Sequence, residues 1–186
     1  MIKVIDTAIE SVKIIEPKIF GDSRGYFYES FSQRDFDSAM GFHVNFVQDN
    51  QSFSHYGVVR GLHFQAPPYA QSKLVRVIMG KVMDVAVDIR KGSPTYGKYV
   101  TCEMSGENHR QFFIPKGFAH GFVVLSETAL FQYKCDEFYH PEAEGALAWN
   151  TPDFAIDWKV PFEKIELSEK DKNHPFLKDF NSPFVY

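Results

Sequence analysis

The sequence predicts an all-β domain, either a sandwich or a barrel, and three observations support that prediction. Short runs with strand composition recur along the chain, with turn signals every ~8–12 residues, a spacing typical of sandwiches and barrels. Helical periodicity is nearly absent. Aromatic side chains are abundant, with 19 Phe and 9 Tyr, and they favour sheets with large packed faces. For a chain of 186 residues, we expect a single domain over residues 1–186.

Composition and charge argue against several classes of protein. The net charge of −4 provides no basic footprint for nucleic acid, and no apolar run reaches the length of a membrane span. Cys102 and Cys135 lack the spacing of a zinc or redox motif, so we expect reduced, buried thiols. Lys3 and Asp6 are untypical of a signal peptide. We therefore expect a cytoplasmic protein that binds neither nucleic acid nor a membrane.

The N-terminal part of the chain predicts a β-rich arm, a turn and one helix. β-branched residues dominate residues 3–15, which indicates strand rather than helix. Gly21 and Gly25 bracket a turn, and we expect a strand over residues 26–31 after it. A short helix begins after Ser32, which has the composition of a helix cap.

Polar residues in this part of the chain have two interpretations. Arg24 and Glu29 could form a surface ion pair or belong to a site. Residues 48–52 form a dense polar run directly after the apolar residues 44–47. Such a run is usually a turn, but it can also present hydrogen-bonding groups to a ligand, because binding sites favour loops set on rigid strands.

Residues 58–77 predict two adjacent strands joined by a loop that contains a Pro-Pro pair, which cannot continue a ladder. The first strand carries Arg60, His63 and Gln65. Because side chains alternate along a strand, His63 and Gln65 share a face with Gly61. Lys73 begins the second strand. An imidazole and two cations on neighbouring strands indicate either a site or a core histidine with solvated charges.

Residues 81–89 show the clearest alternation of apolar side chains in the sequence. One face carries only large apolar side chains, whereas the other carries Asp84 and Asp88 among small residues. A carboxylate is costly to bury without a partner. We therefore expect each aspartate to be paired with a cation or exposed to solvent.

Two further strands carry candidate site residues. A Pro-x-Gly turn precedes a strand over residues 119–125 that contains His120. Residues 128–135 alternate again and place Tyr133 on an aromatic face. Beyond these strands the chain is Pro-rich and acidic, with a short helical turn expected at residues 167–171.

The Gly-x-His sequence that ends at His63 and the Pro-x-Gly-x-x-His sequence that ends at His120 resemble the two motif stretches of the cupin superfamily. This resemblance implies a cupin-type jelly-roll barrel with a few short peripheral helices. Metal-binding cupins have a His-x-His pair and a Glu in the first stretch, but here Gln65 replaces the second His and Lys73 stands where the Glu is expected. A divalent metal requires more ligands than two histidines. We therefore expect no metal in the site.

Further blocks of sequence narrow the resemblance, and they follow one another in the same order over almost the whole chain. The blocks are FGDSRG at 20–25, QDN at 48–50, VRGLH at 59–63, KLVR at 73–76, DVAVD at 84–88, IPKGFAHGF at 114–122 and YK at 133–134. Together they resemble the dTDP-4-dehydrorhamnose 3,5-epimerase family. This resemblance implies an isomerase without a cofactor, acting on dTDP-4-dehydro-6-deoxy-D-glucose in dTDP-L-rhamnose biosynthesis.

The resemblance also implies acid–base chemistry beside a ketone. The C4 ketone acidifies the protons on C3 and C5, so inversion needs a base on one face of the sugar ring and an acid on the other. His63 matches the family's base, because an imidazole titrates near neutral pH, and Tyr133 matches its acid. Lys73 would stabilise the enolate oxygen on C4. Asp171 is the candidate to orient His63, with Asp84 as its rival.

Several residues match the substrate-binding positions of this family. Arg24, Arg60 and Lys170 would bind the diphosphate, since cationic side chains suit phosphate oxygens. His120 and Lys73 would face the sugar. The nucleoside would be bound by Glu29, Gln48, Asp49, Asn50 and Tyr139, with Glu144 nearby. The resemblance further implies a homodimer in which the N-terminal arms swap, so that some of these residues reach the partner's site.

Other functions remain open at this point. A related nucleotide-sugar cupin, either an epimerase acting at one carbon or a 3,4-ketoisomerase, would share most of these motifs. A metal-dependent cupin oxygenase is disfavoured by Gln65 and Lys73. A non-catalytic sugar-binding cupin is disfavoured by the presence of both His63 and Tyr133, because binding alone needs no acid–base pair.

Overall fold

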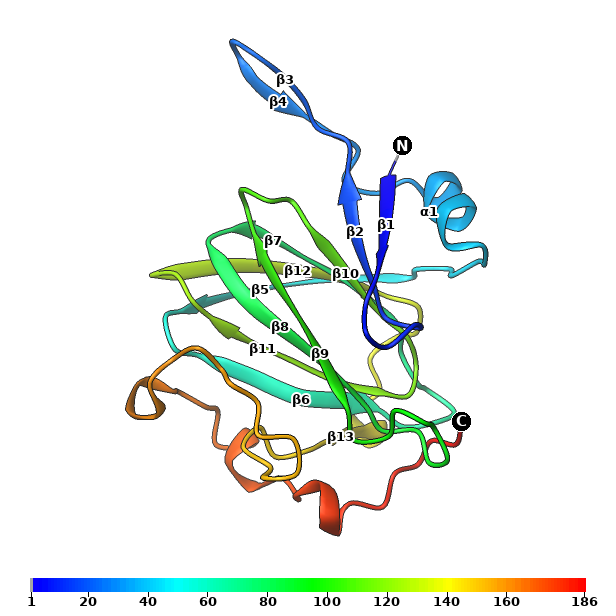
Figure 1. Cartoon of the computed structure of the whole chain (residues 1–186), viewed down its shortest axis with the longest axis vertical. Coiled ribbons are helices and arrows are strands. Elements are labelled where there is room, and N and C mark those ends of the chain that lie inside the picture. The colour runs from blue at the N-terminus through cyan, green and yellow to red at the C-terminus, as the bar shows by residue number, and fades with distance from the viewer. Residues whose placement is uncertain (1) are drawn as a thin grey trace.

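The computed structural model describes residues 2–186 as two antiparallel sheets that face each other in a barrel, with a separate hairpin at one end (Figure 1). The six-stranded sheet contains, in spatial order, β1 (Ile2–Asp6), β2 (Lys13–Pro17), β10 (Gln111–Ile114), β7 (Lys73–Met79), β12 (Thr128–Cys135) and β5 (Gln48–His55). The five-stranded sheet contains β13 (Glu144–Ala146), β6 (Val59–Gln65), β11 (Phe118–Val124), β8 (Lys81–Asp88) and β9 (Tyr99–Ser105). The predicted all-β jelly-roll fold is confirmed.

Helices are short and lie outside the sheets. The α-helix α1 (Gln33–Met40) begins at the predicted position, where the Asp35 N–H donates to Ser32 Oγ at 3.4 Å, and ends at Gly41 in the left-handed region. The remaining helices are 3₁₀ turns, namely η1 (Pro141–Ala143), η2 (Phe162–Lys164), η3 (Asp171–Asn173) and η4 (Leu177–Asp179). None of the helices in residues 2–186 is long and apolar enough to cross a membrane.

The predicted alternation in residues 81–89 is confirmed, because both faces of β8 are buried in different clusters. Val82 and Ala86 point into the barrel, where they pack with aromatic side chains such as Phe131. Met83 and Val85 point to the other side of the sheet. Burying a side chain of this size contributes about 1.5–3 kcal/mol, so these two layers supply much of the driving force for the fold. Cys102 and Cys135 are both free and buried.

The C-terminal part of the chain covers the outer face of the five-stranded sheet although it has almost no regular structure. Trp149 and Trp158 anchor it there, and the Trp158 Nε1–H donates to the Trp149 carbonyl at 3.1 Å. Glu166 lies alongside Val58 in a parallel bridge. In Figure 1 this segment, orange to red, runs along β6 and brings η3 against that strand. Apolar burial rather than backbone ladders therefore positions η3.

Three local predictions are wrong, and each has a physical reason. The strand expected at residues 26–31 is only β4 (Gly25–Phe27), which pairs with β3 (Phe20–Asp22) in the projecting hairpin. The polar run at 48–52 is not a turn but part of β5, an edge strand with one solvated face. The strands that carry His63 and Lys73 are not adjacent, because the loop between them crosses from one sheet to the other.

Candidate active site

A bulge in β6 directs two polar side chains into the barrel. His63 pairs with His120 on β11, and Arg60 pairs with Phe122, so three steps along β6 match two along β11. A bulge of this kind re-aims a side chain that alternation would send to the other face. As a result, Arg60 and His63 line the same cavity although they are three positions apart, a spacing that places side chains on opposite faces of a regular strand. Strict alternation alone places only His63 there.

The cavity lies between the two sheets. Its volume is about 160 Å³, and its lining consists of Gln51, Ser52, Arg60, His63, Lys73, His120, Phe122, Phe131 and Tyr133. A second cavity of about 300 Å³ shares Arg60 and His63 with it and extends towards Glu144, Lys170 and Asp171. His63 comes from the five-stranded sheet, whereas Lys73 and Tyr133 come from the six-stranded sheet. A planar ring held between the sheets would therefore have the imidazole and the phenol on opposite faces.

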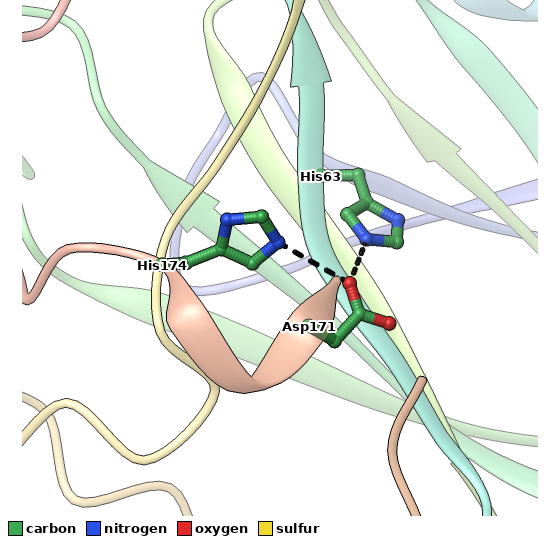
Figure 2. A group of neighbouring side chains, drawn as sticks. All are labelled: His63, Asp171 and His174. Carbon is green, nitrogen blue, oxygen red and sulfur yellow. Dashed lines mark hydrogen bonds and ion pairs between the residues drawn. The ribbon is translucent and has the colours of Figure 1, made fainter. Parts of the chain in front are cut away.

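His63 is bonded to Asp171, which comes from the C-terminal segment. The His63 Nε2 lies 2.5 Å from Asp171 Oδ1 (Figure 2). Burial raises the pKa of Asp171, but hydrogen bonds, first among them that of His63, more than offset this and hold it below its ordinary value. The carboxylate is therefore ionised and acts only as an acceptor, so the contacting Nε2 carries the hydrogen and Nδ1 keeps its lone pair.

Asp84, the rival partner for His63, is bonded to His120 instead. The His120 Nε2 lies 2.8 and 3.0 Å from the two oxygens of Asp84, and both side chains are buried. Burial raises the pKa of Asp84, which the imidazole partly offsets. Asp88, the second aspartate of β8, is paired with Arg90 at 2.7 Å. Asp88 is thus paired with a cation, as expected, whereas Asp84 is buried and paired with the imidazole of His120.

Lys73 and Tyr133 share the opposite wall of the cavity. The Lys73 Nζ lies 5.7 Å from the centroid of the Tyr133 ring. Burial lowers the pKa of Lys73 and raises the pKa of Tyr133 to about 12. The phenol therefore keeps its proton at neutral pH. The buried ammonium, with little solvent around it, is well placed to stabilise a nearby anion.

Gln65, at the position where many cupins have a metal ligand, is used to hold loops. Its Nε2 donates to the carbonyls of Tyr69 and Phe138 at 2.6 and 3.0 Å, and its Oε1 accepts from the His140 N–H at 2.7 Å. In residues 2–186, one group of three potential ligands lies close together, with the atoms of His63, Asp171 and His174 within 4.8 Å of one another. That group is already joined by its own hydrogen bonds.

A hydrogen-bonded network, which we call the rim, reaches the larger cavity at Glu144 and Lys170 and contains several of the predicted nucleoside-binding residues. Glu144 accepts from Tyr139 Oη at 2.8 Å and pairs with Lys170 Nζ at 2.5 Å. Gln48 Oε1 accepts from the Tyr139 N–H at 3.1 Å, and Gln48 Nε2 donates to Asn50 Oδ1 at 3.0 Å. All five residues have polar atoms on one connected rim.

Three of the predicted binding residues lie elsewhere. Asp49 alternates with Asn50 and is bonded to Lys134 at 2.9 Å on the outer face of the six-stranded sheet. Arg24 lies in the projecting hairpin, where it pairs with Asp22 at 2.6 Å, and Glu29 is exposed just after the hairpin. The chain alone does not bring Arg24 and Glu29 to the cavity that holds His63.

Sequence reasoning missed three residues of the site. Gln51 and Ser52 line the cavity because the polar run continues as a strand. The alternation of β5 could have revealed Ser52, which shares a face with Asn50, but it places Gln51 on the other face. His174 contacts Asp171 at 3.3 Å. It follows η3 in a segment without periodicity, so the sequence contains no signal for it.

Comparison with known proteins identifies the family. Residues 6–179 match the model of the dTDP-4-dehydrorhamnose 3,5-epimerase family. The chain belongs to this family. It is 54% identical to the dTDP-4-dehydrorhamnose 3,5-epimerase of Salmonella typhimurium over 178 residues, which cover 95% of this chain and 96% of that protein. The predicted family is therefore confirmed, and with it the predicted class of enzyme, the carbohydrate epimerases among the isomerases.

Solved structures of related epimerases have the same fold. The dTDP-6-deoxy-D-glucose-3,5-epimerase of Legionella pneumophila, in complex with dTDP-4-keto-L-rhamnose, is 52% identical, with a TM-score of 0.93 and coverage of 97% of this chain and 95% of that chain. A 3'-monoepimerase from Streptomyces bikiniensis, in complex with dTDP-quinovose, is 33% identical, with a TM-score of 0.87 and coverage of 93% and 87%. An enzyme named for action at one carbon thus has the same fold.

Proposed function

We propose that this chain converts dTDP-4-dehydro-6-deoxy-D-glucose to dTDP-4-dehydro-L-rhamnose, inverting C3 and C5 without a metal or cofactor, in dTDP-L-rhamnose biosynthesis. The observation that carries this proposal is the placement of His63 and Tyr133 on opposite walls of one cavity, with Lys73 beside the phenol. Family membership and the high identity to 3,5-epimerases support the substrate.

In this reaction, His63 removes the proton from C3 or C5 through its Nδ1 lone pair, and Asp171 stabilises the imidazolium that forms. The pair of electrons from the broken C–H bond moves onto the C4 oxygen as an enolate. Lys73 stabilises this charge. Tyr133 then donates its proton to the opposite face of the same carbon, which inverts the configuration. Positioned acid and base groups each provide about 10²–10⁴-fold, so stabilisation of the enolate must supply much of the remaining acceleration.

The rest of the substrate lies along the larger cavity. Arg60 and Lys170 line it and bind the diphosphate. The rim that contains Gln48, Asn50, Tyr139 and Glu144 contacts the nucleoside, with the Tyr139 ring available for stacking on thymine. His120, whose imidazole contacts Asp84, lines the smaller cavity and faces the sugar.

The proposal includes a homodimer in the cytoplasm. The hairpin that carries Arg24 exposes Phe20, Tyr26 and Phe27, whose exposed fractions are 53%, 61% and 68%. β1 is also an edge strand, which pairs with β2 on one side and leaves its other side unpaired within residues 2–186. Covering these apolar rings with a second copy would place Arg24, Glu29 and the outward-facing Asp49 near a subunit boundary. Two free cysteines suit a reducing compartment.

Epimerisation at C3 alone is the second candidate function, because the monoepimerase from Streptomyces bikiniensis has the same fold over 93% of this chain. A 3,4-ketoisomerase would use the same base and enolate but would move the carbonyl. Neither candidate predicts exchange at C5.

Incubation with dTDP-4-dehydro-6-deoxy-D-glucose in deuterated water distinguishes these candidates. We expect NMR to show that solvent deuterium replaces the protons at both C3 and C5, with both centres inverted. Deuterium at C3 alone would identify a monoepimerase, and a shifted carbonyl would identify a ketoisomerase. Absence of exchange at both carbons in folded protein would contradict the proposed function.

A further inference from the structure

Asp171 is contacted by two imidazoles through the same oxygen. His63 Nε2 lies 2.5 Å from Asp171 Oδ1, and His174 Nε2 lies 3.3 Å from it, as Figure 2 shows. The two rings are nearly perpendicular, at 85°, with centroids 6.2 Å apart. Since an ionised carboxylate can only accept, both contacting nitrogens carry hydrogens. Two donors therefore share one acceptor atom.

The arrangement is fixed on both sides of the carboxylate. The Asp171 N–H is bonded to Ser168 Oγ at 3.2 Å and lies 3.1 Å from the Ser168 carbonyl oxygen. Pro175, which directly follows His174, accepts a hydrogen bond from the Ala148 N–H at 2.9 Å. The Asp171 side chain is 4% exposed, and that of His174 is 15% exposed. Because the backbone is held before and after η3, the carboxylate stays between the two rings.

Sharing an acceptor has a consequence for the base. A carboxylate stabilises an adjacent imidazolium through the negative charge on the oxygen that receives the hydrogen. When a second donor binds the same oxygen, less of that charge is available to the first. We propose that His174 is a positioning residue that withholds part of the Asp171 charge from His63. The His63 ring then stays unprotonated on Nδ1 near neutral pH, so that it can act as the base. This inference rests on the proposed function.

Other charged and titratable groups line the two cavities that His63 lines. They are Arg60 on its own strand, Lys73 on β7, His120 on β11, Tyr133 on β12, Glu144 on β13, and Glu166 and Lys170 in the C-terminal segment, while Asp84 on β8 contacts His120. A comparison of variants at position 174 keeps all of these groups in place. The difference between variants therefore reports the effect of the second donor.

The test compares His174→Phe, which keeps a ring but has no donor, with His174→Gln, which keeps an N–H donor. The pH at which His63 takes up its proton is measured by ¹⁵N NMR in the free enzyme. Loss of a hydrogen bond of ordinary strength should raise this midpoint by about 0.5–1 pH unit in His174→Phe, because the full Asp171 charge then stabilises the imidazolium. The glutamine variant should stay close to the wild type.

Kinetics provide the second measurement. The acid limb of kcat/KM should move to higher pH by the same amount in His174→Phe, while the plateau above it changes little. A lower plateau with an unmoved midpoint in both assays would show that His174 only supports the fold, and a midpoint that falls would reverse the proposed direction. Either result overturns the inference.

Two controls keep the test decisive. If His174→Phe does not fold, His174→Asn, whose shorter side chain cannot reach Asp171, replaces it with the same expected shift. The NMR midpoint needs no substrate, so it separates the two proposals. A shifted midpoint in a protein without epimerase activity would contradict the proposed function, whereas an active enzyme with an unmoved midpoint would contradict only the role of His174.

Discussion

Gly61 and Gly121 approach each other so closely that a Cβ atom on Gly61 would lie 2.5 Å from the Cα of Gly121. They occupy the neighbouring strands β6 and β11, at the bulge that directs the side chains of Arg60 and His63 into the same cavity. Gly61 also has a φ of +131°, a conformation that residues with a Cβ rarely adopt. The geometry of the proposed base therefore depends on two positions that carry no side chain.

Gly121→Ala should destabilise the protein and impair catalysis. The added Cβ would lie 2.6 Å from the Arg60 carbonyl oxygen and would push β6 away from β11. Overpacking of this kind costs about 1–3 kcal/mol of unfolding free energy, measurable by chemical denaturation. Gly21→Ala is the control for stability, since its Cβ would meet nothing nearer than 3.7 Å. Equal unfolding free energies for the two variants would contradict this account.

His63→Ala and Tyr133→Phe should fail at different steps. Without His63 no enolate forms, so both epimerisation and uptake of solvent deuterium at C3 and C5 should be lost. Tyr133→Phe keeps the ring and removes only the donor, so the enolate should still form and be reprotonated from the His63 side. NMR should then show deuterium uptake with little inverted product. Normal inversion by Tyr133→Phe would exclude Tyr133 as the acid.

Lys73 should determine the alkaline limb of the pH profile. Burial lowers the pKa of Lys73, so its charge is lost as the pH rises through a value below that of an ordinary lysine, and enolate stabilisation is lost with it. Tyr133, with its pKa raised to about 12, remains protonated there. In Lys73→Arg the limb should disappear, because arginine keeps its charge. Lys73→Met should lower kcat by about 10²–10³-fold at neutral pH.

Exhaustive chelation should leave turnover unchanged. The Gln65 amide is fully engaged with three loop groups, and the Lys73 ammonium repels a cation in the cavity. In the group of His63, Asp171 and His174, the contacting imidazole nitrogens carry hydrogens and offer no lone pair to a metal. Activity assays before and after chelation test this, and a large loss restored by one divalent ion would contradict it.

The protein should be a dimer at micromolar concentration, as measured by analytical ultracentrifugation. Phe27→Ser should weaken the dimer, because it replaces an exposed apolar ring on the hairpin with a polar side chain. Phe162→Ser is a matched control, since this ring is 74% exposed but lies in the C-terminal segment. A monomer in the wild type, or equal effects of the two substitutions, would argue against an interface at the hairpin.

Much of the fold could be predicted from the sequence because alternation identifies strands and their buried faces. Residues 81–89 and 128–135 illustrate this, since each forms a strand whose side chains divide between two faces as predicted. Alternation does not say which sheet a strand joins. The loop between His63 and Lys73 is equally compatible with a hairpin and with a crossing between sheets, and the crossing is what places these side chains on opposite walls.

The parts of the site that could not be predicted depend on long-range geometry. Arg60 lines the cavity through a bulge that no composition signal marks. The contact of Asp171 with His63, in preference to Asp84, depends on how a segment without periodicity packs on the barrel. His174 belongs to the same segment and has no motif of its own. Such contacts are determined by apolar packing around them rather than by neighbouring residues in the sequence.

The C-terminal segment gives the enzyme an order of assembly. His63 and Asp171 are separated by 108 residues, and the strands that form the barrel all precede the aspartate in the chain. During synthesis the N-terminal portions of a chain fold first, so the barrel can close around an imidazole that still lacks its carboxylate. Only when Trp149 and Trp158 dock does η3 reach β6. The nascent chain can therefore complete the barrel before it positions the carboxylate that contacts the proposed base.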